Sequence, residues 1–274
     1  MGAGSVNADI TVVISCFNYG EFLPEALQSL RRQADGAPRV IVVDDGSTEP
    51  HTTSVLSELR DDVELVRQEN QGASRARNSG LARVETPYVL VLDADDRLTP
   101  DALQVLRRVL DHKPEIGYAY GYLRFFGERT GVMRMPPFDP WRLMFRHIVG
   151  PTALLRTEVV RATKGYDPAF PHYEDWEIWL HALAHGWHGY RVDQPTLEYR
   201  KHGASKFDSD RADYRKYYRL LRNKHSCLYE DLPAMAAASA LSRPERLMYR
   251  YVWGLRPWPA AVEGALYKLF WRPS

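Results

Sequence analysis

The chain has 274 residues, of which 45% are hydrophobic, 12% aromatic and 26% charged, and its formal net charge is +1. This composition excludes an intrinsically disordered chain, and the length is sufficient for a large core without disulfides. Two distant cysteines favour a reducing compartment. The sequence suggests neither a signal peptide nor a run of roughly 18 apolar residues, so secreted, fibrous and integral-membrane proteins are disfavoured.

The first hundred residues alternate between strand and helix patterns. Strands are indicated by β-branched apolar runs, and helices by apolar residues at helical spacing. The predicted strands cover residues 10–15, 39–44, 63–66 and 88–93, and the predicted helices cover residues 22–32, 52–59, 74–84 and 99–110. The last helix is predicted to have Thr99 as its N-cap and Pro100 at its first position. Strands that are apolar on both faces and separated by helices predict a mostly parallel sheet covered on both sides.

The remaining residues give a weaker pattern that becomes helical towards the end. Strands are predicted at residues 116–126, 152–155, 190–192 and 196–199, with a helix at 175–185. Further helices are predicted at residues 211–229, 234–241 and 243–253. The fold class is therefore α/β with a C-terminal helical extension.

Polar residues gather where the predicted strands end. Asp44 and Asp45 close the second strand, and Asp93, Asp95 and Asp96 close the fourth. In parallel sheets of this kind, ligands bind beyond the carboxyl ends of the strands. The pattern therefore predicts a site at this edge before any motif is considered.

The three acids after residue 92 are candidates for a metal site. Alternate residues on an extended segment face the same side, so Asp93 and Asp95 can converge on one ligand. Bunched carboxylates repel one another, and a hard divalent cation with oxygen ligands relieves that repulsion. A turn-and-cap cluster is the alternative interpretation, because Asp is common before a helix.

Two arginines lie at the start of the predicted helix over residues 74–84. Arg75 and Arg77 cannot both point the same way on a helix, so we expect one of them to face the site. Guanidinium groups and the positive end of a helix both attract phosphate. Carboxylates for a metal and guanidinium for phosphates are what a nucleotide diphosphate complex requires.

Four motifs together resemble family 2 glycosyltransferases of the GT-A fold. They are Ile14-Ser-Cys-Phe-Asn-Tyr19, Val43-Asp-Asp-Gly-Ser47, Ala76-Arg-Asn-Ser-Gly80 and Leu92-Asp-Ala-Asp-Asp96, the last containing a DxD motif. Their order and spacing match the family over roughly residues 8–205. The resemblance implies a Rossmann-like sheet and transfer of a sugar from a nucleotide donor.

The resemblance also implies roles for residues of the first-strand, second-strand and helix motifs. Ser15 and Phe17 match the segment that surrounds the nucleotide base, with ordinary strand-end packing as the alternative. Asp45 matches the position that hydrogen-bonds uracil or another base edge. Arg77 matches a nucleotide-contacting arginine.

The acids of the fourth motif are assigned by the same resemblance. Asp93 matches the acid near the ribose, and Asp95 matches the acid that ligates Mn²⁺ or Mg²⁺. Asp96 matches a position either beside the metal ligands or in contact with the sugar.

His172-Tyr-Glu-Asp-Trp176 resembles the Glu-Asp motif that supplies the family's catalytic base. An inverting transfer needs a carboxylate that deprotonates the acceptor hydroxyl. By this resemblance Asp175 is the base, and Glu174 orients either Asp175 or the acceptor. The alternative is a pair of acids that stabilise a helix N-terminus.

Tyr199-Arg-Lys-His-Gly-Ala-Ser205 resembles the segment that closes over the diphosphate in many family members. His202 is then a metal ligand, and Arg200 or Lys201 neutralises phosphate charge. Cations at this place stabilise the departing nucleoside diphosphate. A solvated basic loop is the alternative interpretation.

The resemblance divides the chain at about residue 205. Residues 1–205 are expected to form the GT-A catalytic domain, with a nucleotide-sugar half at about 8–112 and an acceptor half at about 113–205. Residues 206–274 hold 13 Lys and Arg against 7 Asp and Glu, whereas the first 205 residues have a net charge of −5. We expect the helical, basic and aromatic extension to contact a membrane surface peripherally, through residues 247–253 and 265–271, or to pack on the catalytic domain or a dimer partner.

The leading hypothesis is an inverting, metal-dependent glycosyltransferase that uses a nucleotide sugar, most simply a UDP-sugar. Its acceptor is a carbohydrate, a lipid-linked or a small molecule, in polysaccharide, glycolipid or glycoconjugate synthesis, and Mn²⁺ or Mg²⁺ is the expected cofactor. The expected location is the cytoplasm, with the inner face of the membrane as an option. A non-catalytic nucleotide-sugar-binding scaffold and a GT-A-like sugar nucleotidyltransferase are the alternatives, and nucleic-acid binding is not expected.

Overall fold

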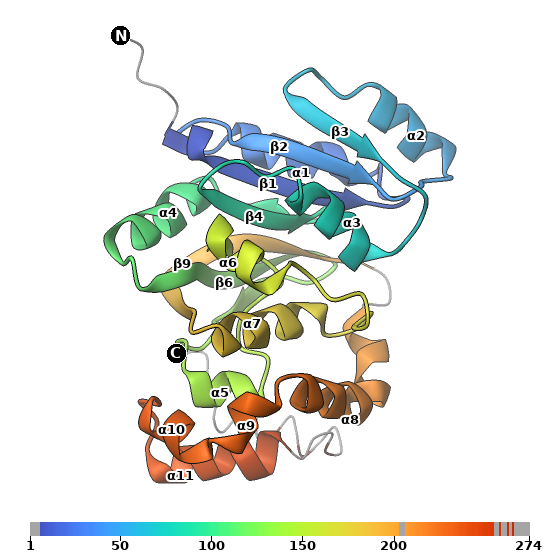
Figure 1. Cartoon of the computed structure of the whole chain (residues 1–274). Helices are drawn as coiled ribbons and strands as arrows, with labels where there is room; N and C mark the ends of the chain where they lie inside the picture. The colour runs from blue at the N-terminus through green and yellow to red at the C-terminus, as the bar shows by residue number, and fades with distance from the viewer. Residues whose placement is uncertain (1–5, 203–205, 255–257, 259–261, 263–264, 266–274) are drawn as a thin grey trace.

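The computed structural model describes residues 6–202, 206–254, 258, 262 and 265 of the chain. It contains one nine-stranded sheet with the strand order β3-β2-β1-β4-β8-β6-β9-β5, and β7 pairs with β6 outside this path. A short 3-10 helix, η1 (Val6–Asp9), leads into the first strand. The sheet lies across the middle and top of the molecule, and the last helices form a layer below it (Figure 1).

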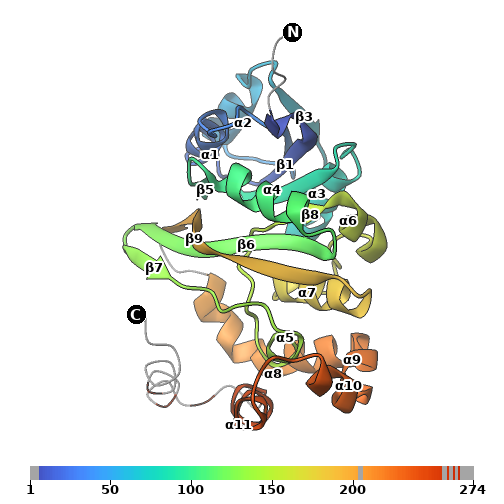
Figure 2. The same ribbon diagram turned by 90° about the vertical axis from the view of Figure 1, so that its left-hand side faces the viewer.

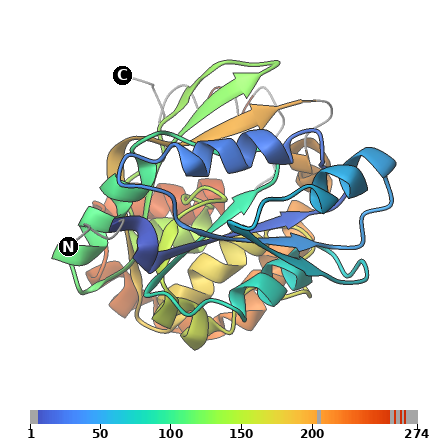
Figure 3. The same cartoon turned by 90° about the horizontal axis from the view of Figure 1, so that it is seen from above.

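The first four strands form the parallel part of the sheet. They are β1 (Ile10–Cys16), β2 (Arg39–Asp44), β3 (Val63–Arg67) and β4 (Tyr88–Asp93), connected by α1 (Leu23–Arg31), α2 (Pro50–Ser57) and α3 (Ala73–Leu81). The apolar runs of β1, β2 and β4 are buried almost throughout. Figure 3 shows α1 and α3 on opposite sides of the strands. The predicted order and covering of these elements are confirmed.

The second half of the sheet begins where β4 pairs antiparallel with β8 (Leu154–Arg156). The further strands are β5 (Arg97–Leu98), β6 (Ile116–Gly127), β7 (Gly131–Met133) and β9 (His188–Lys201). The short pairs β6–β8, β5–β9 and β6–β7 are antiparallel, whereas the long pair β6–β9 is parallel. The sheet is thus mixed, with parallel pairing along its longest strands.

Two predictions about local structure in and next to β9 are wrong. Residues 190–192 and 196–199 were expected as separate strands but are parts of the single strand β9, because β6 pairs with it from end to end through register shifts. Thr99 is not the N-cap of the next helix, α4 (Ala102–His112). Its backbone N–H donates to the carbonyl of Thr196, and its hydroxyl donates to the carbonyl of Pro195, so β9 binds Thr99 before the helix begins.

Three helices flank the second half of the sheet. They are α5 (Pro140–Phe145), α6 (Thr157–Thr163) and α7 (Glu174–Ala184). The indole of Trp176 on α7 is buried and donates to the carbonyl of Leu143 at 2.8 Å. This contact joins α7 to α5, so the N-terminal turn of α7 is held in place by the core beneath it.

The C-terminal helices form the layer on the far side of α5 and α7 from the sheet (Figure 2). They are α8 (Lys206–Lys224), α9 (Ser226–Glu230), α10 (Leu232–Ala237), α11 (Arg243–Met248) and a π-helical turn, η2 (Tyr249–Trp253). The ring of Tyr218 stacks on Trp176 with 5.5 Å between centroids, and the hydroxyl of Tyr229 donates to Met144 at 2.6 Å. No described helix is long and apolar enough to cross a membrane.

The expected amphipathic segment at residues 247–253 has one face packed on the protein. Tyr249 and Trp253 are buried, whereas Leu247 and Tyr251 are 47% and 52% exposed. The second expected segment, residues 265–271, lies outside the described residues except for Ala265.

Candidate active site

The carboxyl end of β1 lies between the acidic ends of its two neighbours. In the sheet register Ser15 is opposite Val43 of β2 and Asp93 of β4. Phe17 follows β1 with 43% of its surface exposed, and Tyr19 is 37% exposed. Exposed rings beside strand-end carboxylates can stack on a planar base, and the family resemblance assigns Phe17 to the segment around the base.

Asp45 is buried and accepts three hydrogen bonds from the segment before α3. One oxygen accepts from the Gln68 amide at 2.7 Å and from the Gln71 backbone at 2.9 Å, and the other accepts from the Gly72 backbone at 2.9 Å. Gly72 has φ +87°, a conformation that favours glycine. Asp45 therefore stabilises the turn before α3. Recognition of a nucleotide base by Asp45 stays a prediction.

The next turn is fixed by Asn18, a residue to which the sequence patterns assign no contact. Asn18 has φ +55°, and its side-chain oxygen accepts from the backbone of Thr48 at 2.9 Å and of Glu49 at 3.0 Å. The amide thus bridges the end of β1 to the start of α2. An Asn is suited to this place because it tolerates the left-handed region and bonds the backbone.

Arg77 on α3 joins the two halves of the candidate site. Its Nη2 donates to Asp93 at 2.7 Å, while its Nη1 lies 3.4 Å from both Glu174 and Asp175. Arg75 is exposed on the opposite side of the helix, so only Arg77 of the two faces the site, as the helical geometry predicts.

The environment of Arg77 keeps its guanidinium charged although it is buried. Burial opposes the charge, but Asp93 first and then Asp175 and Glu174 outweigh burial and raise the pKa of Arg77 well above its ordinary value. The guanidinium also lies over the ring of Tyr166, 5.0 Å from the centroid. A buried cation among three carboxylates fixes their positions and screens their repulsion.

Glu174 and Asp175 lie in the first turn of α7, as the Glu-Asp motif predicts. Tyr173 precedes them with φ +61°, a left-handed conformation at the N-cap position. Asp175 is 18% exposed at its side chain and Glu174 is 8% exposed. Asp175 is therefore the more accessible of the two to an acceptor.

Asp95 and His202 form the second part of the site. Asp95 Oδ2 lies 2.9 Å from His202 Nε2, and the imidazole packs against Phe22 with 4.8 Å between centroids. Burial and then the charge of Asp93 raise the pKa of Asp95, while the contact with His202 opposes that shift. The sequence separates these two residues by 107 positions, and the fold brings them together.

Asp96 is almost fully buried beside them. One oxygen accepts from the backbone N–H of Arg200 at 2.8 Å, and the other has no hydrogen-bond partner among the described residues. Burial, then Asp95 and Asp93, raise the pKa of Asp96 well above its ordinary value. Burial and the two neighbouring carboxylates thus disfavour the charged form of Asp96.

Arg200 is held by residues from three elements. Its Nε donates to the carbonyl of Asp95 at 2.9 Å, and its Nη2 pairs with Glu25 of α1. Its guanidinium lies 4.3 Å from the centroid of the Phe126 ring and 4.8 Å from that of Phe22. Through these contacts Arg200 connects the loop that contains Asp95 to α1 and β6.

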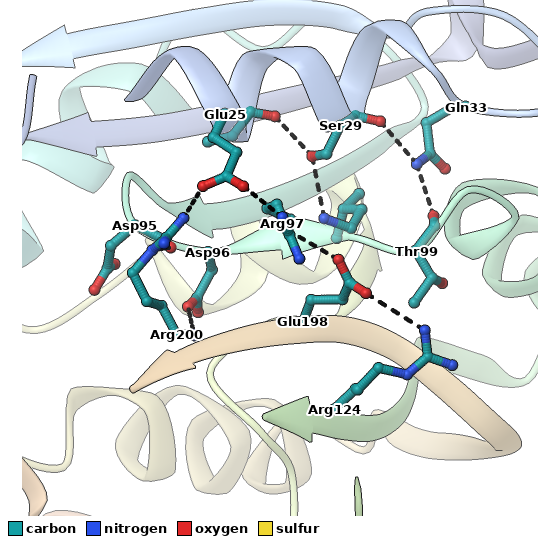
Figure 4. A network of polar contacts seen from close by, with 12 residues as sticks. Glu25, Ser29, Gln33, Asp95, Asp96, Arg97, Thr99, Arg124, Glu198 and Arg200 are labelled. Carbon is teal, nitrogen blue, oxygen red and sulfur yellow. Dashed lines mark hydrogen bonds and ion pairs between the residues drawn. The ribbon is translucent and has the colours of Figure 1, made fainter. Parts of the chain in front are cut away.

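Arg200 and Glu25 belong to a larger network of polar side chains (Figure 4). Arg97 pairs with Glu25 and lies 2.9 Å from Glu198, and Arg124 lies 3.4 Å from Glu198. No sequence motif marks Glu25, Arg97 or Glu198 as part of the site. Glu25 lies on an amphipathic helix where a solvated acid is ordinary, and its partner is 175 residues away, so no local pattern marks it.

Lys201 points to a different environment. Its ammonium lies 4.4 Å from the centroid of the Tyr199 ring and 5.2 Å from that of Phe125. Burial and the nearby acids, Asp96 first, raise the pKa of Tyr199. The Lys201 ammonium thus packs on the aromatic rings of Tyr199 and Phe125.

The donor set fits a divalent metal that shares its shell with substrate. Among the described residues, no group of three His, Cys, Asp or Glu side chains is arranged to hold a metal ion. Mg²⁺ commonly takes one or two protein carboxylates and completes its shell with phosphate oxygens and water. Asp95 and His202 are the pair that would hold it, and the unpartnered oxygen of Asp96 lies in the same acidic cluster.

Three comparisons with known proteins identify the family and the fold of this chain. The model of the family "Glycosyl transferase family 2" matches residues 11–164. An uncharacterized glycosyltransferase of Methanocaldococcus jannaschii is 20% identical over 206 residues, which are 70% of each chain. Glycosyltransferase GlyA of Streptococcus pneumoniae is 31% identical over 130 residues, 46% of this chain and only 18% of that protein.

A solved structure supports the fold. Staphylococcus aureus TarS, residues 1–349 in complex with UDP-GlcNAc, aligns with a TM-score of 0.67 and 17% identity, over 96% of this chain and 76% of that one. The expected GT-A fold is confirmed. Since the family model covers more than half of the chain, this protein belongs to glycosyl transferase family 2 and is a glycosyltransferase.

Proposed function

We propose that this protein is an inverting, metal-dependent glycosyltransferase that moves a sugar from a UDP-sugar to an acceptor hydroxyl. The observation that carries the proposal is the path of contacts from Asp95 and His202, 2.9 Å apart, to the catalytic-base motif. The charge of Asp93 raises the pKa of Asp95, Asp93 binds Arg77, and Arg77 lies 3.4 Å from Asp175. A donor-side acid cluster and an acceptor-side carboxylate thus face one another across one buried cation.

The nucleotide is assigned to the carboxyl ends of β1 and β2. In this proposal Phe17 stacks on the base, Ser15 lines its pocket, and Asp45 accepts a hydrogen bond from the base edge while holding the turn before α3. Asp93 lies near the ribose. The TarS structure with UDP-GlcNAc shares this fold, which supports a UDP-sugar as the first donor to test.

A divalent metal, Mn²⁺ or Mg²⁺, would be held by Asp95 and His202, with Asp96 beside them. When bound, it supplies positive charge to the diphosphate leaving group. Arg200 keeps the Asp95 loop in position for this, and Lys201 adds positive charge at the same edge.

Asp175 acts as the general base. Its carboxylate takes the proton from the acceptor hydroxyl while that oxygen attacks the anomeric carbon. The bond between the anomeric carbon and the diphosphate oxygen breaks on the opposite face, so the configuration inverts. Arg77 fixes the Asp175 oxygen 3.4 Å from its Nη1, and Glu174 on the same turn orients either Asp175 or the acceptor.

The acceptor is proposed to be a glycan or glycoconjugate. Similar proteins include a teichoic acid poly(glycerol phosphate) polymerase of Staphylococcus epidermidis, 34% identical over 34% of this chain, and a poly-beta-1,6-N-acetyl-D-glucosamine synthase of Staphylococcus aureus, 26% identical over 41%. Peripheral membrane contact or dimerisation through the C-terminal helices stays a prediction, and exposed Leu247 and Tyr251 are its candidate residues.

The test is a panel of nucleotide sugars with Mn²⁺, scored first by thermal shift and then by release of nucleoside diphosphate. A preferred donor must raise the melting temperature by mass action. Release of UDP that Asp95→Ala abolishes would exclude a non-catalytic scaffold. Consumption of a nucleoside triphosphate with a sugar phosphate, and no UDP release, would instead favour a nucleotidyltransferase.

A further inference from the structure

The C-terminal layer contains a groove of about 820 Å³ that the proposed reaction does not use. Its basic residues are Arg215, Arg219 and Arg222, and its aromatic residues are Tyr218, Tyr229 and Trp258. We call it the arginine groove. Glu230 is the one acid among its lining residues, so the groove carries net positive charge.

The three arginines share one face of α8. Their spacing of four and then three residues places them on adjacent turns. Because an α-helix rises 1.5 Å per residue, they span about 10 Å along the axis. A row of that length suits several phosphates in a chain better than one isolated phosphate.

The groove is built on anchored aromatic rings. The Tyr229 hydroxyl donates to the carbonyl of Met144 at 2.6 Å. The guanidinium of Arg222 lies 5.1 Å from the centroid of the Tyr229 ring and 5.9 Å from that of Tyr218. Stacking of this kind limits the positions of the Arg222 guanidinium while its N–H groups stay free to donate.

Two of the three arginines in the groove are available to an anionic ligand. In the part of the chain that the structure describes, neither Arg219 nor Arg222 forms an ion pair with a carboxylate. Both side chains belong to exposed residues. Guanidinium groups in this state bind phosphate oxygens with charge-assisted hydrogen bonds.

Helix α8, which contains the three arginines, follows the active-site residue His202 closely in the sequence. Helix α8 begins four residues after His202. Arg215 and Arg222 are about 14 and 24 Å along the helix axis from its first residue. A ligand that reaches from the site to the groove must therefore be chain-like.

We propose that the arginine groove is an acceptor subsite for an anionic, phosphodiester-linked chain, held by Arg215, Arg219 and Arg222 while its end reaches Asp175. The inference rests on the proposed glycosyl transfer and names its acceptor class. A concave groove favours a chain over a membrane, because the exposed apolar residues Leu247 and Tyr251 do not line it.

The experiment measures binding of a fluorescently labelled glycerol-phosphate hexamer to the full chain by anisotropy, with a glycerol-phosphate dimer and maltohexaose for comparison. We expect the hexamer to bind most tightly and maltohexaose least. The variant Arg215→Gln/Arg219→Gln/Arg222→Gln should weaken hexamer binding about tenfold or more. Arg219→Gln alone should weaken it about threefold, with the melting temperature unchanged because Arg219 is an exposed residue.

The matched control is Lys216→Gln/Arg243→Gln/Arg250→Gln, which removes three positive charges from the same layer outside the groove. It should leave both hexamer binding and UDP release unchanged. Equal weakening by the control, or equal binding of dimer and hexamer, would overturn the proposal. So would arginine-dependent binding to phosphatidylglycerol vesicles with no hexamer binding, which would assign the groove to a membrane.

UDP release tests the proposed glycosyl transfer, and hexamer binding tests the proposed acceptor subsite, so the two proposals can fail separately. If wild-type protein releases no UDP from any donor yet binds the hexamer through the three arginines, the proposed transfer is wrong and the ligand class of the groove is right. If UDP is released and hexamer binding ignores the arginines, the groove proposal is overturned and the transfer stands.

Discussion

The guanidinium of Arg77 donates to Asp93 at 2.7 Å, and through this contact the end of β4 is tied to the first turn of α7. In the proposed mechanism, Asp93 is one of the donor-side acids and Asp175 lies on the acceptor side. A single buried cation therefore sets the distance between the two proposed substrates.

Replacing Arg77 should destabilise the protein strongly. Arg77→Met leaves Asp93, Glu174 and Asp175 without their shared cation, and breaking a buried ion pair in this way costs about 3–5 kcal/mol. Chemical denaturation measures the loss. Arg75→Met is the control, since Arg75 is exposed on the same helix, and a comparable loss there would contradict the assignment.

Asp175→Asn should retain donor binding and lose transfer. The amide cannot accept the acceptor proton, so kcat should fall about 10²–10⁴-fold, while the thermal shift given by the donor persists. Glu174→Gln removes the neighbouring charge from the same turn and should have the smaller effect. If Asp175→Asn transfers sugar at nearly the wild-type rate, another residue is the base.

Removal of the metal should abolish UDP release, as replacement of Asp95 should. A chelator should abolish UDP release by the wild-type protein, and Mn²⁺ or Mg²⁺ should restore it. Asp95→Asn should not respond to added metal in activity or in melting temperature. Full activity of the chelated enzyme would reject the metal assignment.

Glu25 should act on the site through Arg200. Glu25→Gln removes the partner of the Arg200 guanidinium, so the Asp95 loop loses one of its constraints. We expect the KM for the donor to rise about fivefold and kcat to change less, with Glu25→Asp partly restoring the wild-type KM. Glu21→Gln, at an exposed position just before α1, is the control, and an equal effect there would show that general charge is responsible.

The stability of the protein should fall as the pH drops below neutrality, in part because of His181. Burial lowers the pKa of His181 from 6.5 to about 4. Between those values the unfolded chain binds a proton that the folded chain does not, so the free energy of unfolding decreases as the pH falls through this window. His181→Gln should reduce the decrease in the free energy of unfolding between pH 6.5 and 4 by an amount on the order of 2 kcal/mol.

Urea denaturation at several pH values between 6.5 and 4 measures that slope. His185→Gln makes the same chemical change at an exposed position one turn later. An identical slope in wild type and His181→Gln would show that other groups cause the acid sensitivity.

The sequence by itself determined the parallel strands, most of their helices and the residues that end them. These features follow from short-range patterns: apolar runs, helical spacing and strand-end acids within a few positions of one another. The sequence also predicted that one of Arg75 and Arg77 faces the site, because two residues that are two positions apart on a helix point in different directions.

Only the tertiary structure decided how distant groups meet. The pairing of Glu25 with Arg200 and the single course of β9 depend on contacts between segments about 70 to 175 residues apart in the chain. Such contacts leave no periodic signal, because the charged residues that make them look locally like any solvated side chain. Burial and pairing of those charges, which give the site its chemistry, arise only when the sheet has closed around them.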